Sequence, residues 1–219
     1  MSLVIRILAA LTVLAGIICA VFGNIHLGLS GFFFGALTAV LAEPIRRWLF
    51  RAELHLSFGQ TSDYIAPTGM FNNGKKVGEA VYLRAKVINK TGTTAKRCRA
   101  YLVNIEERSA RTGNFEQTIH SDTLALFWAC KRSRDENLAP LDIPQGVNQY
   151  FDILYAASIG PAQFVPCIEF VPARFEEFMS KPGTYRFTVM VTGDEVAPVY
   201  LKIIFTWTGV WDKFTATLE

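Results

Sequence analysis

Residues 183–194 read GTYRFTVMVTGD, a stretch in which every second side chain is apolar. Tyr185, Phe187, Val189 and Val191 occupy these positions, and longer or more polar side chains lie between them. Successive side chains of a β-strand point to opposite faces of its sheet, so this alternation predicts a strand with one buried face. The stretch indicates a protein built from sheets.

The same period-two pattern recurs toward both ends of the chain from here, with Gly, Asn and Pro turn signals between the segments. About seven to nine short strands at such spacing are typical of an antiparallel sandwich, or of the same strands closed on themselves. Residues 52–219 are numerous enough to bury a core without metals or disulfides. The alternating segments are residues 54–58, 81–87 and 98–103, and further strands are predicted at 150–155, at 199–207 and at 124–128, whose continuous apolar run is typical of a fully buried strand.

Residues 1–51 follow another pattern, in which continuous apolar runs replace the alternation. The run 3–22 is interrupted only by Arg6 and Thr12, and a second run begins at residue 27 after a polar break. A helix of about 20 apolar residues matches the thickness of a bilayer. We therefore predict an N-terminal two-helix transmembrane hairpin, with spans at 3–22 and 27–48, that precedes the β-sandwich domain of residues 52–219.

The positions of the charges predict the orientation of this hairpin. The chain carries 22 Lys and Arg against 19 Asp and Glu, a formal net charge of +3, and residues 1–51 hold the entire surplus. Residues 52–219 are neutral, which disfavours nucleic acid as a partner. Positive residues beside apolar spans mark the cytoplasmic side, so we expect a multi-pass protein of a bacterial inner membrane, with the lipid bilayer as partner and both termini cytoplasmic. The topology and interface residues are Arg6, Arg46, Arg47, Trp48 and Arg51.

Small residues recur at helical spacing within the predicted spans. Such residues let two helices approach closely in a membrane. They predict either self-association of the hairpin or packing of its two helices against each other, and the second interpretation is favoured. The helix-packing residues are Gly16, Ala20, Gly31, Gly35 and Ala39.

Several motifs of the C-terminal part resemble those of bacterial immunoglobulin-like domains. These domains contain a hairpin in which one strand ends in a Val-x-Asn motif followed by glycine, and the next strand begins with a small residue. The resemblance, which extends to bacterial membrane-tethered proteins with this sandwich, implies an immunoglobulin-like fold and transfers no catalytic residue. The motifs are Val87-x-Asn89-x-x-Gly92-x-x-Ala95, Leu126-Phe127-Trp128, Asp142-Ile143-Pro144-x-Gly146 and Gly183-x-Tyr185-x-Phe187.

No motif of known chemistry is found in the sequence. The three histidines, His26, His55 and His120, are far apart, and no H-x-x-x-H or C-x-x-C pattern supports a metal site. The glycine-rich patterns that cradle phosphates are also lacking. The sequence therefore predicts no enzyme, no catalytic residue, no metal and no cofactor.

Two basic clusters are candidates for binding a small anionic ligand. The first lies on the strand that follows the Asn89 turn, and the second lies in a loop after Cys130. Clustered cations bind phosphates and carboxylates, but they also occur on ordinary solvated surfaces, and this second interpretation is favoured. The cluster residues are Lys96, Arg97, Arg99, Lys131, Arg132 and Arg134.

Two functions are compatible with this pattern. The first is a membrane-anchored, non-enzymatic binding or assembly module that presents its sandwich to a protein partner or to other copies of the chain. The alternative is a ligand-gated membrane effector of antiphage defence, whose β-domain senses a small anionic messenger of the cyclic nucleotide type and clusters the helices. The two differ in whether a nucleotide stabilises the protein.

Overall fold

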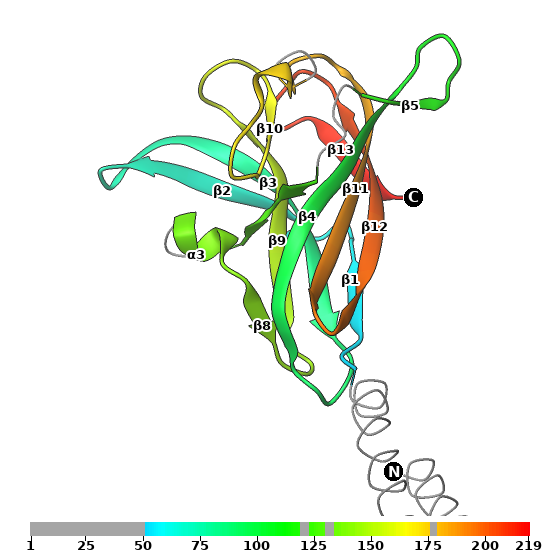
Figure 1. The fold of residues 1–219 in the computed structure, drawn as a ribbon. Helices are drawn as coiled ribbons and strands as arrows, with labels where there is room; N and C mark the ends of the chain where they lie inside the picture. Colours follow the sequence, from blue (N-terminus) through cyan, green and yellow to red (C-terminus); the bar gives the residue numbers. More distant parts are fainter. Residues whose placement is uncertain (1–50, 119–122, 130–133, 176–178) are drawn as a thin grey trace, which may run out of the picture. The chain divides into compact units, whose positions relative to one another are not determined.

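The computed structural model describes residues 51–118, 123–129, 134–175 and 179–219. The chain divides into two compact units, Met1–Leu49 and Phe50–Glu219. In the described part, the regular secondary structure of the second unit is almost wholly antiparallel strands, which form two sheets (Figure 1).

The strands of the first sheet are β1 (Leu54–Ser57), β2 (Ile65–Asn72), β3 (Lys75–Asn89), β7 (Phe127–Trp128), β9 (Asn148–Ala157) and β10 (Phe164–Pro166). Their order is β1-β3-β9-β10. β2 pairs with the first part of β3 and β1 with its last residues, so these two strands follow each other along one edge of β3. β7 pairs with β9 on the side away from β3.

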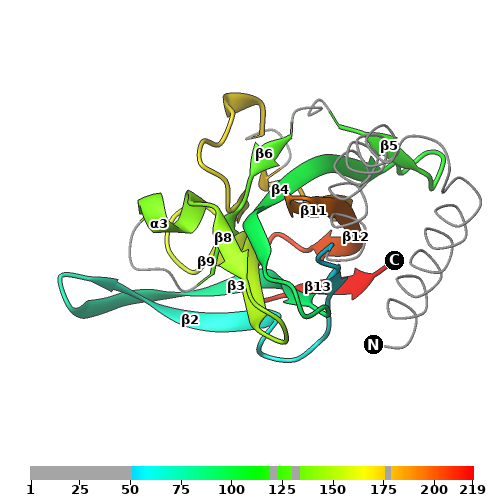
Figure 2. The ribbon, with the colours of Figure 1, turned by 60° about the horizontal axis from the view of Figure 1, so that its bottom comes forward.

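The strands of the second sheet are β4 (Ala95–Arg108), β5 (Phe115–Gln117), β6 (Leu124–Ala125), β8 (Leu141–Ile143), β11 (Gly183–Asp194), β12 (Val196–Trp207) and β13 (Phe214–Leu218). Their order is β13-β12-β11-β4-β5, and the short strands β6 and β8 also pair with β4. Figures 1 and 2 show that β3 and β9 lie in a different layer from β4, β11 and β12. The β-sandwich predicted from the alternation agrees with this architecture.

Large side chains from both sheets meet in one core. The alternating residues of β11, Tyr185 to Val191, are fully buried at every second position. The ring of Phe164 from the first sheet lies 5.3 Å from Tyr185, 5.1 Å from Phe205 and 5.7 Å from Trp207 of the second sheet, measured between ring centroids. Aromatic contacts of this kind contribute beyond the area that they bury. They join the two sheets into one packed unit.

Two buried polar side chains hold the turns of the sandwich. Asn89, at the end of β3, donates from Nδ2 to the carbonyl oxygens of Thr93 (2.6 Å) and Ile143 (2.9 Å), and its Oδ1 accepts from the backbone N–H of Thr91. Tyr185, near the start of β11, donates its hydroxyl to the carbonyl oxygen of Lys181 at 2.8 Å. Buried polar groups must be paired to be tolerated, so both residues fix the backbone around them.

The structure contradicts the transmembrane part of the predicted fold class. The helical segments with described bounds are α3 (Arg134–Leu138) and the 3₁₀ turn η1 (Ala173–Phe175), and nowhere in the described ranges is a helix long and apolar enough to cross a membrane. The predicted helical hairpin and the multi-pass inner-membrane localisation are corrected accordingly. Most of the buried apolar residues in the described part lie in strands and face a sheet-lined core. The predicted spans, 3–22 and 27–48, lie outside the described residues.

Candidate functional site

The outer face of the first sheet carries a row of aromatic and charged side chains. Because β3 alternates, its core residues Leu83, Ala85 and Val87 are separated by Tyr82, Arg84 and Lys86, which are only partly buried. The antiparallel register places Tyr82 opposite Tyr155, Arg84 opposite Asp152 and Lys86 opposite Tyr150 on β9. Two strands distant in sequence therefore build one continuous outer face.

An irregularity in β9 brings these residues together. The register shifts between the pairs Leu83–Leu154 and Arg84–Asp152, which leaves Ile153 as an extra residue on β9. A bulge of this kind re-aims the side chains on one strand while the pairing continues on both sides of it. Its consequence is that Asp152 and Tyr155 lie on the same outer face, although three positions separate them.

Arg84 and Asp152 form the most buried ion pair among the described residues. Arg84 Nε donates to Asp152 Oδ1 at 2.6 Å, with side-chain exposures of 17% and 12%. Burial raises the pKa of the Asp152 carboxyl, and the Arg84 guanidinium opposes that shift. Burial removes water from the carboxylate and so destabilises its charged form. A positive group or a hydrogen-bond donor beside the carboxylate stabilises that charged form.

A stack of two tyrosine rings lies beside this ion pair. The Arg84 guanidinium carbon lies 5.5 Å from the centroid of the Tyr82 ring, and Tyr82 stacks on Tyr155 with centroids 5.4 Å apart. Burial raises the pKa of Tyr82 to about 12, so its hydroxyl keeps its proton at neutral pH. Farther along the face, Lys86 Nζ lies 5.8 Å from the centroid of the Tyr64 ring. The face thus repeats one arrangement, a cation over a tyrosine.

A cavity of 560 Å³ opens beside the Tyr82–Tyr155 stack. Its walls come from β3, β7, β9 and β10, from the segment that follows β10, and from α3. Two backbone hydrogen bonds hold that segment: Cys167 N–H donates to the Ile153 carbonyl, and Phe127 N–H donates to the Cys167 carbonyl. Burial also raises the pKa of the Cys167 thiol well above its ordinary value, so Cys167 is an inert wall residue.

The hairpin formed by β2 and the first part of β3 projects from the sandwich at the end of this face (Figure 1). Asn73 and Gly74 both have positive φ, as the tight turn between two paired strands requires. Phe71, beside this turn, is 67% exposed, and its ring lies over Gly69, where a Cβ atom would meet it at 2.9 Å. The absence of a side chain at Gly69 therefore lets an aromatic ring lie along the hairpin.

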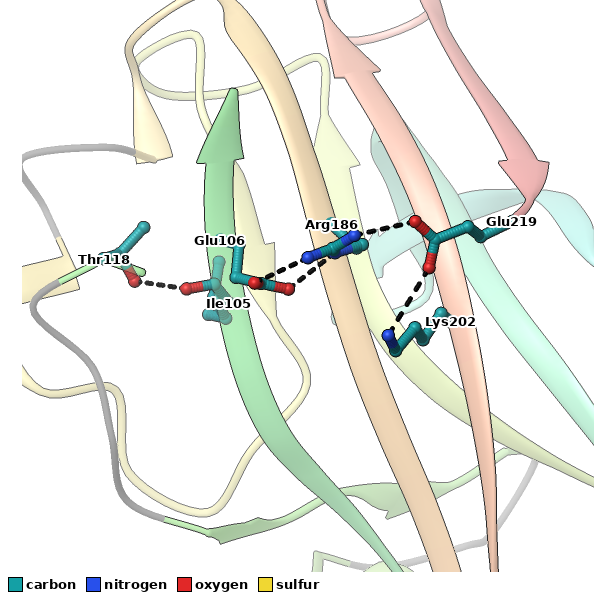
Figure 3. A network of polar contacts seen from close by, with 6 residues as sticks. All are labelled: Ile105, Glu106, Thr118, Arg186, Lys202 and Glu219. Atoms are coloured by element: carbon teal, nitrogen blue, oxygen red, sulfur yellow. Dashed lines mark hydrogen bonds and ion pairs between the residues drawn. The ribbon is translucent and has the colours of Figure 1, made fainter. Parts of the chain in front are cut away.

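A second polar network lies on the outer face of the other sheet (Figure 3). Arg186 donates through Nε and Nη2 to the two carboxylate oxygens of Glu106, both at 2.6 Å, and through Nη1 to Glu219 at 2.7 Å. Lys202 Nζ lies 3.7 Å from the other oxygen of Glu219. In the same view, the Thr118 hydroxyl donates to the carbonyl oxygen of Ile105 at 2.7 Å. These contacts connect β4, β11 and β12 with Glu219, so they stabilise the arrangement of these strands.

The predicted anion-binding residues are only partly within the described structure. On β4, the Arg97 backbone N–H donates to Asp142 at 2.8 Å, and its guanidinium lies 3.8 Å from Asp194, the register partner of Lys96. Two carboxylates therefore accompany this cluster. The side chains of Lys131, Arg132 and Arg134 lie outside the described ones, so anion binding stays a prediction.

Most of the other predicted site residues lie outside the described residues. Arg51 is exposed. The remaining topology and helix-packing residues are among positions 1–50. Over the described ranges, three or more His, Cys, Asp or Glu side chains nowhere gather in an arrangement that could hold a metal ion.

The outer face formed by β3 and β9 was not predicted from the sequence. Its signal was present, because Tyr82, Arg84 and Lys86 stand between apolar residues and must therefore point away from the core. What the sequence did not reveal is that Asp152 and Tyr155 would lie opposite them. That pairing depends on contacts between strands more than 60 residues apart.

Comparison with known proteins identifies no family for this chain. No family model matches it, and no curated protein matches it. A solved structure, the archaeal flagellum of Methanospirillum hungatei strain JF1, is 13% identical, with 95% of this chain and 96% of that chain covered and a TM-score of 0.36. A TM-score this low supports no argument about fold or function. What the structure itself shows of the resemblance to immunoglobulin-like domains is an all-β, sandwich-like fold.

Proposed function

We propose that the described part of this chain is a non-enzymatic binding and assembly module of the immunoglobulin type. The strand order supports this type: β1, β3 and β9 oppose β12, β11 and β4, as strands A, B and E oppose G, F and C in an immunoglobulin domain. The hydrogen bond from Tyr185 to the Lys181 carbonyl supports it as well, since a tyrosine near the start of strand F makes such a bond in these domains.

The projecting β2–β3 hairpin is the observation that carries the proposed binding role. It bears Phe71 at 67% exposure and Val77 at 45%, and Ile159, also 45% exposed, packs against it at Gly78. Burying such side chains against a partner removes apolar area from water, and aromatic residues are enriched at the centres of interfaces. The paired strands of a hairpin present these side chains at a smaller ordering cost than an unpaired loop would.

The proposed partner is a protein, and in the first place a second copy of the chain. Residues 52–219 are electrically neutral, and a net charge near zero lets identical domains approach without long-range repulsion. The free edge of β2 contains Pro67 and a register shift after Met70, both of which hinder addition of another strand. The contact is therefore proposed through side chains of the hairpin and not through edge-to-edge pairing.

Site-specific photo-crosslinking in the full chain tests this proposal. A benzoylphenylalanine in place of Phe71 keeps the aromatic character of the tip, and the same residue in place of the exposed Arg111, in the loop between β4 and β5, is the matched control. Irradiation is expected to give an adduct of twice the chain mass from position 71 and little from position 111.

An adduct of another mass from position 71 would still support a binding role and would identify a different protein as the partner. Equal or no crosslinking at the two positions would contradict the proposal. Sedimentation velocity of the Phe71→Ser variant provides a second readout, since loss of the ring should lower the self-association constant by about tenfold or more.

A further inference from the structure

A groove of 370 Å³ lies between the β2–β3 hairpin and the loop that joins β12 to β13. Both strands of the hairpin form one wall, and Trp211 and Asp212 form the other. Trp211 packs against the core but is only partly buried, and it stacks on no other aromatic side chain of the described part. The wall that faces the hairpin therefore offers an aromatic ring beside a carboxylate.

The exposed Phe71 side chain lies on the same face of the hairpin as this groove. Pro67 and Gly69 line the groove, and Pro67 pairs with Val81, whose side chain is buried in the core. Phe71 continues this series of alternate positions, so it shares their face, and its ring lies over Gly69. The ring is thus next to the groove, on the side of the turn, with 67% of its surface exposed.

The charges of the groove and of the hairpin turn are complementary. Glu79, which lines the groove, already pairs with Lys76 at 2.5 Å. Asp212 is exposed and has no ion pair within the described ranges, and the neighbouring Lys213 is exposed and outside the groove lining. At the turn, Lys75 is likewise exposed and forms no ion pair with a described residue. The groove therefore keeps one negative charge and the turn one positive charge.

We propose that this groove receives the Phe71 side chain of a second copy of the chain. The inference rests on the proposed self-association and specifies the contact through which it occurs. The incoming ring packs against Trp211, which gives an aromatic pair in a water-excluding groove. Lys75 of the incoming hairpin approaches Asp212, and the two opposite charges attract each other.

The position of the groove makes the contact reciprocal. Phe71 is two residues from Gly69 and four from Pro67, which corresponds to about 7–13 Å along a strand. Because the ring and the groove lie on one face, a two-fold axis between them lets each hairpin insert into the groove of the other copy at the same time. Such an assembly closes at the dimer.

Peptide mapping of the photo-crosslink from position 71 tests the location of the contact. Full chains labelled with ¹⁵N and carrying benzoylphenylalanine at position 71 are mixed with unlabelled chains, so that crosslinks between copies have one heavy and one light peptide. The crosslinked light peptides are expected to contain Trp211 and Asp212 or the groove residues 67–69 and 79–81. An adduct of twice the chain mass that maps elsewhere would overturn this inference and leave the assembly role intact, whereas absence of any such adduct would refute both.

A charge exchange tests the same contact without changing a buried residue. Lys75→Glu and Asp212→Lys are expected to lower the self-association constant by about tenfold each, because a symmetric dimer contains the pair twice. The double variant should recover to within about twofold of the wild type, measured by sedimentation velocity of the full chain. The control combines Asp212→Lys with Lys90→Glu, an exposed lysine after β3, and should not recover.

Equal association constants for the two double variants would overturn the proposed pairing of Lys75 with Asp212. Oligomers that continue to grow beyond the dimer as the protein concentration rises would overturn the reciprocal arrangement.

Discussion

Two arginine–carboxylate pairs on opposite outer faces show how local geometry sets the charge of a residue. Arg186 gives Glu106 two short hydrogen bonds, and these bonds hold the pKa of Glu106 below its ordinary value. Arg84 gives Asp152 a 2.6 Å hydrogen bond through Nε, and burial there outweighs its effect and raises the pKa of Asp152. Lowering the pH therefore removes stability at Glu106 and adds stability at Asp152.

Replacing Glu106 with glutamine should make the protein less sensitive to acid. Its folded-state pKa is depressed, so the stability that it contributes is complete above the unfolded-state pKa, about 4.3, and is lost as the pH falls through the lower folded-state value. At pH 7 we expect Glu106→Gln to lower the free energy of unfolding by about 1–3 kcal/mol, measured by urea titration.

The difference in free energy of unfolding between the wild type and Glu106→Gln should become smaller as the pH approaches 3. The control is Glu79→Gln, which removes an exposed ion pair with Lys76 and should change stability by less than about 0.5 kcal/mol. A difference between wild type and Glu106→Gln that stays constant from pH 7 to pH 3 would contradict the charge-based explanation.

At the scale of elements, irregularities in the strands matter as much as the strands themselves. The period-two pattern predicted a strand over 185–191 followed by a turn at 193–195, and β11 (Gly183–Asp194) contains the predicted strand and extends beyond it at both ends. The sequence did not show that the pairing of β11 with β4 shifts between Thr192 and Asp194. Gly193 lies at this shift, where a Cβ atom would be 2.5 Å from the carbonyl oxygen of Lys96. The close approach of two backbones there requires glycine.

The Gly193→Ala variant is expected to be destabilised by about 1–3 kcal/mol, because β4 or β11 must move to admit the methyl group. Gly92→Ala is the control, since the atom nearest to its added Cβ is a side-chain oxygen at 3.9 Å. Thermal unfolding followed by circular dichroism measures both variants. Equal melting temperatures for the two variants would show that the backbones of β4 and β11 can separate at Gly193 without loss of stability.

At the scale of the molecule, the core joins both sheets into one cooperative unit. A single cluster of buried side chains includes Leu83 and Phe151 of the first sheet together with Phe187 and Phe205 of the second. Neither sheet can lose its packing without exposing the inner face of the other. A single core shared by both sheets favours unfolding in one step.

Residues 51–219 produced alone should therefore unfold in a single transition. Tryptophan fluorescence and far-ultraviolet circular dichroism, recorded on the same urea titration, are expected to give coincident midpoints. Leu83→Ala should lower both midpoints together, by an amount equivalent to about 2–5 kcal/mol. Two separate midpoints, or a shift of only one of them, would contradict a common core.

The sequence by itself determined the positions of the long core strands and which of their faces are buried, because alternation is a property of neighbouring residues, but it did not predict β2 or β10. It also located the turn at Asn89 and the alternating core residues of β11. Its hydropathy and charge patterns predicted a membrane hairpin, which the described structure contradicts. Only the tertiary structure decided that Arg84 meets Asp152, that a bulge places Tyr155 beside Tyr82, and that a cavity forms next to them. Those features depend on the register between distant strands, and register follows from the packing of the whole core and not from any single segment.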